Sequence, residues 1–246
     1  MEWLFFVTFV VTVLVSILSG MSGGGGGFVV MPYFLFLGLP PANALATSKF
    51  GGLGTALGTL VAFKGKGLVH KKLVVPLMII TFFCSILAAW LIPQIDPAAF
   101  ENAIGFVLFA MVPTLFIKKA SFQPGSRSRK WIIVGFIAFT IFSFMQGLVG
   151  TGLGTLVLLA LMYLFGLSAL EANATKRMSQ SVQAVVLVIL LGLGGMLVWG
   201  HAIAGFLGSI VGSHIGAHIA IKKGNEFVKI VLATTMVVSG VVLIIW

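Results

Sequence analysis

The sequence predicts an all-α, polytopic membrane protein built from two inverted-topology repeats of about five helices each. Three observations lead to this prediction: a very apolar composition, a motif that occurs twice, and basic loops that change sides between the two copies. Of the 246 residues, 59% are hydrophobic and only 8% are charged, whereas soluble domains carry about 25% charged residues. Because so few charges cannot form a water-facing surface, we expect a chain embedded in the lipid bilayer with short loops outside it.

The net charge of +10 would suit a nucleic-acid-binding protein, but the positions of the cations argue against that class. Twelve of the 15 Lys and Arg residues fall in three groups, at 64–72, 118–130 and 222–229. Basic residues gathered in short loops are typical of the cytoplasmic side of membrane proteins. We therefore expect a multi-pass protein of the cell inner membrane with these loops in the cytoplasm, and no nucleic acid among its partners.

An internal repeat divides the chain into two halves. Residues 20–27 (GMSGGGGG) align with 147–154 (GLVGTGLG), and residues 44–50 (ALATSKF) align with 172–178 (ANATKRM). The separation changes from 127 to 128 residues, so one insertion accounts for both matches. The predicted organisation is a first membrane repeat over 1–118, a basic cytoplasmic linker over 119–130 and a second membrane repeat over 131–246.

Loop charge predicts that the two halves are inverted relative to each other. The basic loop at 64–72 corresponds to the uncharged segment 192–200, and the loop at 93–97, which contains Asp96, corresponds to the basic segment 222–226. Matched loops thus face opposite sides of the membrane, which is typical of inverted-repeat transporters. The same rule places both termini outside.

Apolar segments at 3–19, 24–37, 42–62, 73–92 and 99–117 predict the five helices of the first half. The second segment is shorter than the roughly 20 residues that a full crossing needs. The first pair of helices is therefore either two spans or a re-entrant pair, and segment 131–165 has the same two alternatives. The sequence is compatible with a monomer or a homodimer.

The glycine-rich segments predict broken helices near the midplane. Each glycine inside a helix costs about 1 kcal/mol relative to alanine, so the run 23–27 ends one helix and exposes the N-terminus of the next. Free amides at a helix N-terminus attract anions, and the second break supplies a matching start. The alternative is that these glycines only permit close helix packing. The predicted substrate-binding residues at the breaks are Ser22, Gly23, Gly24, Gly25, Gly26, Gly150, Thr151 and Gly152.

Three cations lie in apolar surroundings: Lys49, Lys176 and Arg177. A charge at the bilayer centre costs roughly 2.5–3.5 kcal/mol on insertion scales, and the only acid close in sequence is Glu171, near a predicted helix start. An anionic ligand would balance these charges, whereas the alternative is that the side chains extend to the membrane interface. Polar neighbours complete the predicted substrate-binding set: Asn43, Thr47, Ser48, Gln146 and Thr175.

These segments resemble the TauE/SafE family, the sulfite-exporter-like permeases. The resemblance is carried by SGMSGGGGGFVVMP (19–32), GLPPANALATSKF (38–50), GLVGTGLGTL (147–156) and EANATKR (171–177). The second half departs from the pattern, with Leu153 within the glycine motif and Ser168-Ala169 where the first half has Pro-Pro. The resemblance implies transport of sulfite, sulfonates, thiosulfate or related organosulfur anions, often in export, with protons as a coupling ion.

A secondary transporter of small anions working by alternating access is the favoured function, and an anion channel is the alternative. An intramembrane enzyme is less favoured because the sequence shows no nucleophile–base pair and no nucleotide loop. A purely structural membrane protein would not need buried cations.

We expect no catalytic residue and no cofactor. We also expect no metal site, because His214 and His218 lack a third ligand. The sequence leaves open the choice between import and export, and between proton coupling and uniport.

Overall fold

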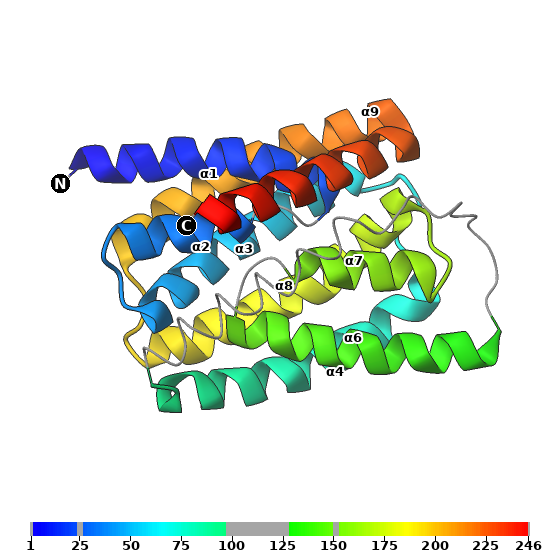
Figure 1. Ribbon diagram of the computed structural model, residues 1–246, viewed down its shortest axis with the longest axis horizontal. Helices are drawn as coiled ribbons and strands as arrows, with labels where there is room; N and C mark the ends of the chain where they lie inside the picture. The colour runs from blue at the N-terminus through cyan, green and yellow to red at the C-terminus, as the bar shows by residue number, and fades with distance from the viewer. Residues whose placement is uncertain (1, 24–26, 97–127, 150–152, 246) are drawn as a thin grey trace.

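The structure is a computed structural model that describes residues 2–23, 27–96, 128–149 and 153–245. Within these ranges the chain forms helices and turns without a strand, which confirms the predicted all-α class (Figure 1). The predicted helix at 99–117 and most of the linker lie outside the described residues. The elements are α1 (Glu2–Ser22), α2 (Gly27–Phe36), α3 (Pro41–Phe63), α4 (Lys71–Leu91), the 3₁₀ turn η1 (Ile92–Gln94), α6 (Arg129–Val149), α7 (Gly154–Tyr163), α8 (Ala169–Leu193) and α9 (Trp199–Ile245).

Five of the described helices are long and apolar enough to cross a membrane: α1, α4, α6, α8 and the first part of α9. The 23-residue α3 has the length of a span but a lower hydrophobicity, because it carries Lys49 together with several glycines and threonines. Most of α3 is buried between α8 and α9. Helices α3 and α8, which contact each other, are the two least apolar of the long described helices.

The helices run between two ends of the molecule (Figure 1), and the residues at these ends differ in charge. We call one the basic end. It contains the turn at 64–70, the start of α6, the turn at 164–168 and the bend of α9 at Gly224, which share one apolar cluster. Nine of the described Lys and Arg residues lie there. The other, the N-terminal end, contains the start of α1 and the turns at 37–40, 92–96 and 194–198, where a second apolar cluster lies.

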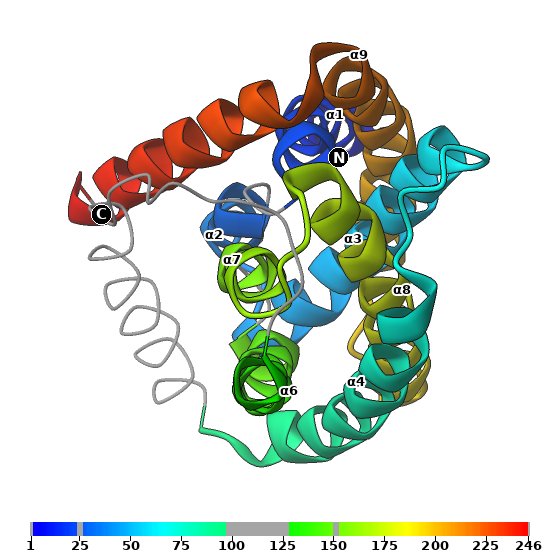
Figure 2. The same cartoon turned by 90° about the vertical axis from the view of Figure 1, so that its right-hand side faces the viewer.

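Two half-length helices, α2 and α7, extend from the middle of the molecule towards opposite ends. Each has ten residues, or about 15 Å, half of the hydrocarbon thickness. Phe34 of α2 belongs to the cluster at the N-terminal end, with Ile92, whereas Leu161 of α7 belongs to the cluster at the basic end, with Phe63. Viewed along the long axis, both lie inside the arrangement of longer helices (Figure 2).

The first pair of helices in each half returns to the end from which it starts. The hydroxyl groups of Thr8 in α1 and Tyr33 in α2 lie 2.8 Å apart, although α1 is 21 residues long and could cross the bilayer alone. In the second half, the rings of Phe136 in α6 and Phe165 after α7 lie 5.1 Å apart. The sequence was compatible with two spans or with a re-entrant pair. In the structure, each pair consists of a long helix followed by a short helix that returns towards the same end.

Helix packing is matched between the two halves. Helix α1 packs along α9 as α6 packs along α4, α3 packs on α9 as α8 packs on α4, and α3 and α8 contact each other in the centre. Glycines allow the closest of these approaches: a Cβ atom added at Gly212 or Gly216 of α9 would overlap the backbone carbonyl of Val13 or Ile17 in α1. Such close contacts between helix backbones are typical of membrane proteins.

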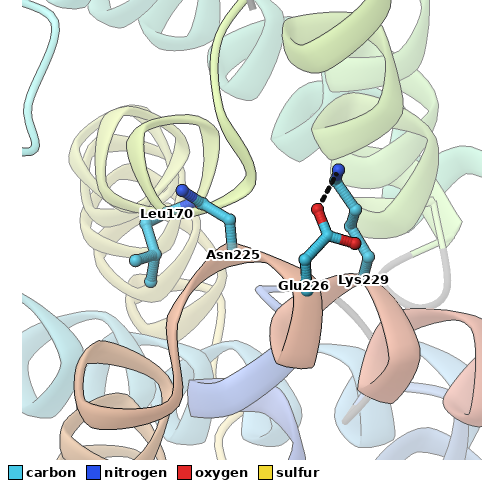
Figure 3. Close-up of polar contacts among 4 residues, drawn as sticks. All are labelled: Leu170, Asn225, Glu226 and Lys229. Carbon is cyan, nitrogen blue, oxygen red and sulfur yellow. Dashed lines mark hydrogen bonds and ion pairs between the residues drawn. The ribbon is translucent and has the colours of Figure 1, made fainter. Parts of the chain in front are cut away.

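A polar contact fixes the bend of α9 at the basic end. Gly224 interrupts the helix with φ of 80°, a left-handed conformation that favours glycine. The following Asn225 accepts a hydrogen bond of 2.9 Å from the amide of Leu170 (Figure 3). The start of α8 is also closed by a capping box between Ser168 and Glu171, so the acid closest in sequence to Lys176 and Arg177 satisfies a helix end instead.

Candidate functional site

The three predicted central cations are all buried. Lys49 lies in the third turn of α3, and Lys176 and Arg177 lie in the third turn of α8. Their exposed fractions are 6%, 1% and 1%. The side chains therefore do not extend to the membrane interface, which was the alternative explanation for their presence.

Each half of the chain supplies a cation to a broken helix of the other half. Lys49 of the first half donates a hydrogen bond of 2.7 Å to the carbonyl of Gln146, near the C-terminus of α6. Arg177 of the second half donates to the carbonyl and hydroxyl of Ser19, near the C-terminus of α1, at 2.5 and 3.0 Å. Lys49 and Arg177 are equivalent in the repeat, and so are Ser19 and Gln146. The same interaction therefore occurs twice: once from the first half to the second, and once from the second half to the first.

Lys176 lies between the two helix breaks. Its ammonium donates a hydrogen bond to the carbonyl of Gly23, directly after α1. A Cβ atom added at Gly154, where α7 begins, would lie 2.7 Å from the Lys176 Nζ atom. Gly23 itself has φ of 74°, so a glycine is favoured at the point where α1 ends. One ammonium group thus contacts the end of α1 and the start of α7.

Amide side chains complete the surroundings of the cations. Gln183 accepts from Lys49 at 3.2 Å and donates to the carbonyl of Ser143 at 2.9 Å, while Gln180 accepts from Arg177 at 2.9 Å. Asn173 donates to the carbonyl of Gly20 at 3.1 Å. The carbonyl acceptors were not predicted from the sequence. A positive charge is stabilised beside a helix C-terminus by its free carbonyls, and this rule, applied to the ends of α1 and α6, could have identified them.

The site retains positive charge in the described part of the chain. The ion pair that the described residues form is Lys229–Glu226, at 2.7 Å, on the exposed surface of the basic end (Figure 3). The groups that hydrogen-bond to the three cations are carbonyls, a hydroxyl and amides. These groups are neutral. Three basic side chains therefore meet at two helix breaks, and the hydrogen-bond partners that the described residues supply to them are neutral.

The structure places the other predicted site residues in different environments. Thr47 accepts a hydrogen bond from the amide of Val198 at 3.3 Å, and Thr175 accepts from the amide of His70 at 3.0 Å. The two threonines are 128 residues apart, and so are the two amide donors. Both threonines therefore hold the turns that begin α9 and α4, which is a structural role that the sequence did not indicate.

The remaining predicted residues fall into three groups. The hydroxyls of Ser22 and Ser48 donate to carbonyls of their own helices. Asn43 is partly exposed near the start of α3, and Gln146 is buried beside the cations. Gly24, Gly25, Gly26, Gly150, Thr151 and Gly152 lie outside the described residues.

Comparison with known protein families shows to which family the chain belongs. The model of the family described as sulfite exporter TauE/SafE matches residues 8–243. The chain belongs to the TauE/SafE family. This confirms the resemblance seen in the two glycine motifs, and it covers both halves of the chain.

Curated relatives of this TauE/SafE chain are similar to it over most of their length. A probable membrane transporter protein of Haemophilus influenzae is 28% identical and covers 91% of this chain and 88% of its own. The probable membrane transporter proteins YfcA of Escherichia coli and YjnA of Bacillus subtilis are each 25% identical, and this chain covers 83% and 96% of their lengths. No solved structure matches the chain. The protein is thus a multi-pass member of a membrane transporter family.

Proposed function

We propose that the protein is a secondary transporter that exports a small sulfur-containing anion, such as sulfite, a sulfonate or thiosulfate, by alternating access. The observation that carries this proposal is the burial of Lys49, Lys176 and Arg177 with neutral hydrogen-bond partners. An anion bound between them would replace its hydration by ammonium and guanidinium donors. It would also offset the roughly 2.5–3.5 kcal/mol that each central charge costs on insertion scales.

The helix breaks support the same site. The first turns of α2 and α7 carry backbone amides without partners in their own helices. Their partial positive charge adds to that of the side chains. Because the ammonium of Lys176 lies beside the start of α7, an anion at this ammonium would reach amides and cation together. This combination favours a compact oxyanion over a neutral solute.

The half-length helices offer a route to alternating access. Helix α2 lies between the cations and the N-terminal end, and α7 lies between the cations and the basic end. Displacing one of them at a time would open the site to one side. We infer that the basic end faces the cytoplasm, by the bias of Lys and Arg towards cytoplasmic loops, so export would begin with α7 displaced and end with α2 displaced.

Transport by purified protein in liposomes tests the site. We expect Lys49→Met and Arg177→Met each to reduce exchange of radiolabelled sulfite to the level of protein-free liposomes, because each removes a donor to the anion. Lys64→Met, at the exposed end of the same α3, is the matched control and should transport like the parent. Size-exclusion chromatography verifies that each variant is folded. Parental rates in both central variants would refute the site.

A ligand panel tests the substrate class. We expect at least one of sulfite, thiosulfate, sulfoacetate, taurine and sulfate to raise the unfolding temperature of the parent and not that of Arg177→Met. A ligand at 100 times its dissociation constant adds about 2.7 kcal/mol of stability, which a thermal-shift measurement detects. A panel without any shift would refute the assignment to sulfur anions.

A further inference from the structure

A polar cluster joins three helices at the N-terminal end, away from the central cations. His201, in the first turn of α9, is 8% exposed, and its Nδ1 atom lies 2.8 Å from the hydroxyl of Thr8 in α1. The same hydroxyl lies 2.8 Å from that of Tyr33 in α2 and 2.9 Å from the carbonyl of Leu4. The cluster therefore connects α2 to the long helices that flank it.

The hydroxyl of Thr8 can serve both protonation states of His201. It has one proton and two acceptor sites. When it donates to the carbonyl of Leu4, it can accept from the Tyr33 hydroxyl and from a protonated Nδ1. When it donates to Nδ1, the ring is neutral and Tyr33 still donates to Thr8. Rotation of one hydroxyl thus keeps the junction bonded while the imidazole gains or loses a proton.

The ring contacts that the structure describes around the imidazole are aromatic and carry no negative charge. Phe5 of α1 lies edge-on to the imidazole at 4.9 Å between ring centroids, and Phe34 of α2 lies edge-on at 6.1 Å. The charged residues of the elements packed around it are Glu2, six residues before Thr8 in α1, and Lys49 of α3, whose ammonium is bonded to Gln146. A protonated ring without a carboxylate contact in the described chain is better stabilised by water. Protonation therefore favours separation of α2 from this junction.

The repeat shows that packing alone does not require polar groups here. With the separations of 127 and 128 residues, the equivalents of Thr8, Tyr33 and His201 are Gly135, Ala160 and Leu73. At the basic end Phe165 packs against Gly135, and Leu73 belongs to the apolar cluster there. The equivalent positions are thus apolar at one end and include a titratable group at the other. This difference in chemistry calls for a function beyond stability.

We propose that His201, held by Thr8 and Tyr33, is a proton-binding site whose protonation opens the N-terminal end of the transporter. The inference deepens the proposed function, because it assigns the proton to a group at one gate and leaves the central cations to the anion. A proton that enters from the side of the N-terminal end would separate α2 from α1 and α9. Loss of this proton would allow the junction to close.

Cysteine accessibility tests the gate without any substrate. The native cysteine is removed by Cys84→Ala, and Met31→Cys then reports on α2, because Met31 is fully buried. Its labelling rate with a membrane-impermeant maleimide is divided by that of Phe36→Cys, an exposed residue of the same helix, which removes the pH dependence of the thiol. We expect the ratio to rise between about pH 8 and pH 5, where histidine titrates, by at most about tenfold per pH unit for one proton.

Substitutions of histidine decide the assignment. His201→Gln should abolish the pH dependence of the ratio, whereas His218→Gln, an exposed histidine of the same helix, should retain it. If His201→Gln does not purify as a folded protein, Thr8→Val is used instead and should move the transition to lower pH, because the imidazolium loses its acceptor. A flat ratio in the parent, or an unchanged transition in His201→Gln or Thr8→Val, would overturn the proposal. These outcomes do not depend on which solute is carried, so they are separate from failure of the proposed function.

Discussion

At the scale of single residues, the buried cations act through backbone groups as much as through side chains. Lys49, Lys176 and Arg177 each donate to a carbonyl near the end of a broken helix. The free carbonyls of a helix C-terminus carry partial negative charge, which stabilises a nearby cation. They cannot neutralise it, so the same residues can hold the helix ends and still attract an anion. A small displacement of one ammonium should therefore affect transport more than stability.

Gly154→Ala tests this expectation. The added Cβ would lie 2.7 Å from the Nζ atom of Lys176, which must move away from the carbonyl of Gly23. Because Nζ is the end of a flexible side chain, we expect a change in unfolding free energy below about 1 kcal/mol. Transport should fall by about tenfold or more, since small misplacements of a binding group are costly. Both quantities are measured on the same purified sample.

The control for Gly154→Ala is Gly52→Ala in α3. A Cβ atom at Gly52 meets no atom within 4 Å, so transport should stay near the parental value, and stability should not fall and can rise by up to about 1 kcal/mol. A Gly154→Ala protein that transports as fast as Gly52→Ala would show that the position of Lys176 is not important for binding.

The cations themselves could be predicted from the sequence, because charged residues in apolar surroundings stand out and the two motifs repeat. Their partners are harder to identify, since every residue carries a carbonyl and only the expected ends of α1 and α6 indicate which carbonyls a helix leaves free. The roles of Thr47 and Thr175 were also not predictable, because their partners are turn amides 151 and 105 residues away, respectively. Burial of polar residues indicated importance without distinguishing binding from structural support.

At the scale of helices, glycines set how closely the long elements approach. Helix α9 lies against α1 through Gly208, Gly212 and Gly216, and against α3 through the glycines of that helix. The predicted segments at 3–19, 24–37, 42–62 and 73–92 correspond to observed helices whose ends differ by at most three residues. These helix ends could be predicted from the sequence because the length of an apolar run, and the Pro or Gly residues that interrupt it, determine where a helix begins and ends. The return of α2 towards the start of α1 depends on tertiary contacts, which the sequence does not show.

A glycine substitution tests the closest helix contact. In Gly212→Ala the added Cβ would overlap the carbonyl of Val13, which is backbone and cannot rotate away. We expect a loss of about 1–3 kcal/mol, the usual range for overpacking, and a lower unfolding temperature. Gly205→Ala in the same helix is the control, because its Cβ would lie 3.7 Å from a methyl group of Thr12. Equal unfolding temperatures for the two variants would contradict close packing of α1 on α9.

At the scale of the whole molecule, the two ends differ in charge and in the half-length helix that closes them. The basic end collects the turns that carry most Lys and Arg residues, as the sequence pattern indicated, and the described loops of the opposite end carry Asp96. The inverted topology of the halves and the boundaries at 118 and 131 stay predictions. The matched hydrogen bonds of Lys49 and Arg177 support them, because each links equivalent positions across the two halves.

Labelling in intact cells tests which end faces the cytoplasm. In a Cys84→Ala background, Gln94→Cys lies at the N-terminal end and Lys66→Cys lies at the basic end, and both positions are exposed. We expect an impermeant thiol reagent to label Gln94→Cys in intact cells and Lys66→Cys only after lysis, as the bias of basic loops requires. The reverse pattern would invert the proposed direction of transport along with the topology.

The exchange of cations between the halves has a consequence for biogenesis. Lys49 enters the membrane with α3, but its acceptor Gln146 follows 97 residues later in the chain. At synthesis rates of about 5–20 residues per second, roughly 5 to 20 seconds pass between the synthesis of Lys49 and the synthesis of the carbonyl that accepts its hydrogen bond. During this interval α3, one of the two least apolar long helices, depends on the insertion machinery or on temporary partners to stay in the membrane. The first half of the chain is therefore the stage of synthesis at which quality-control proteases would have the best opportunity to act.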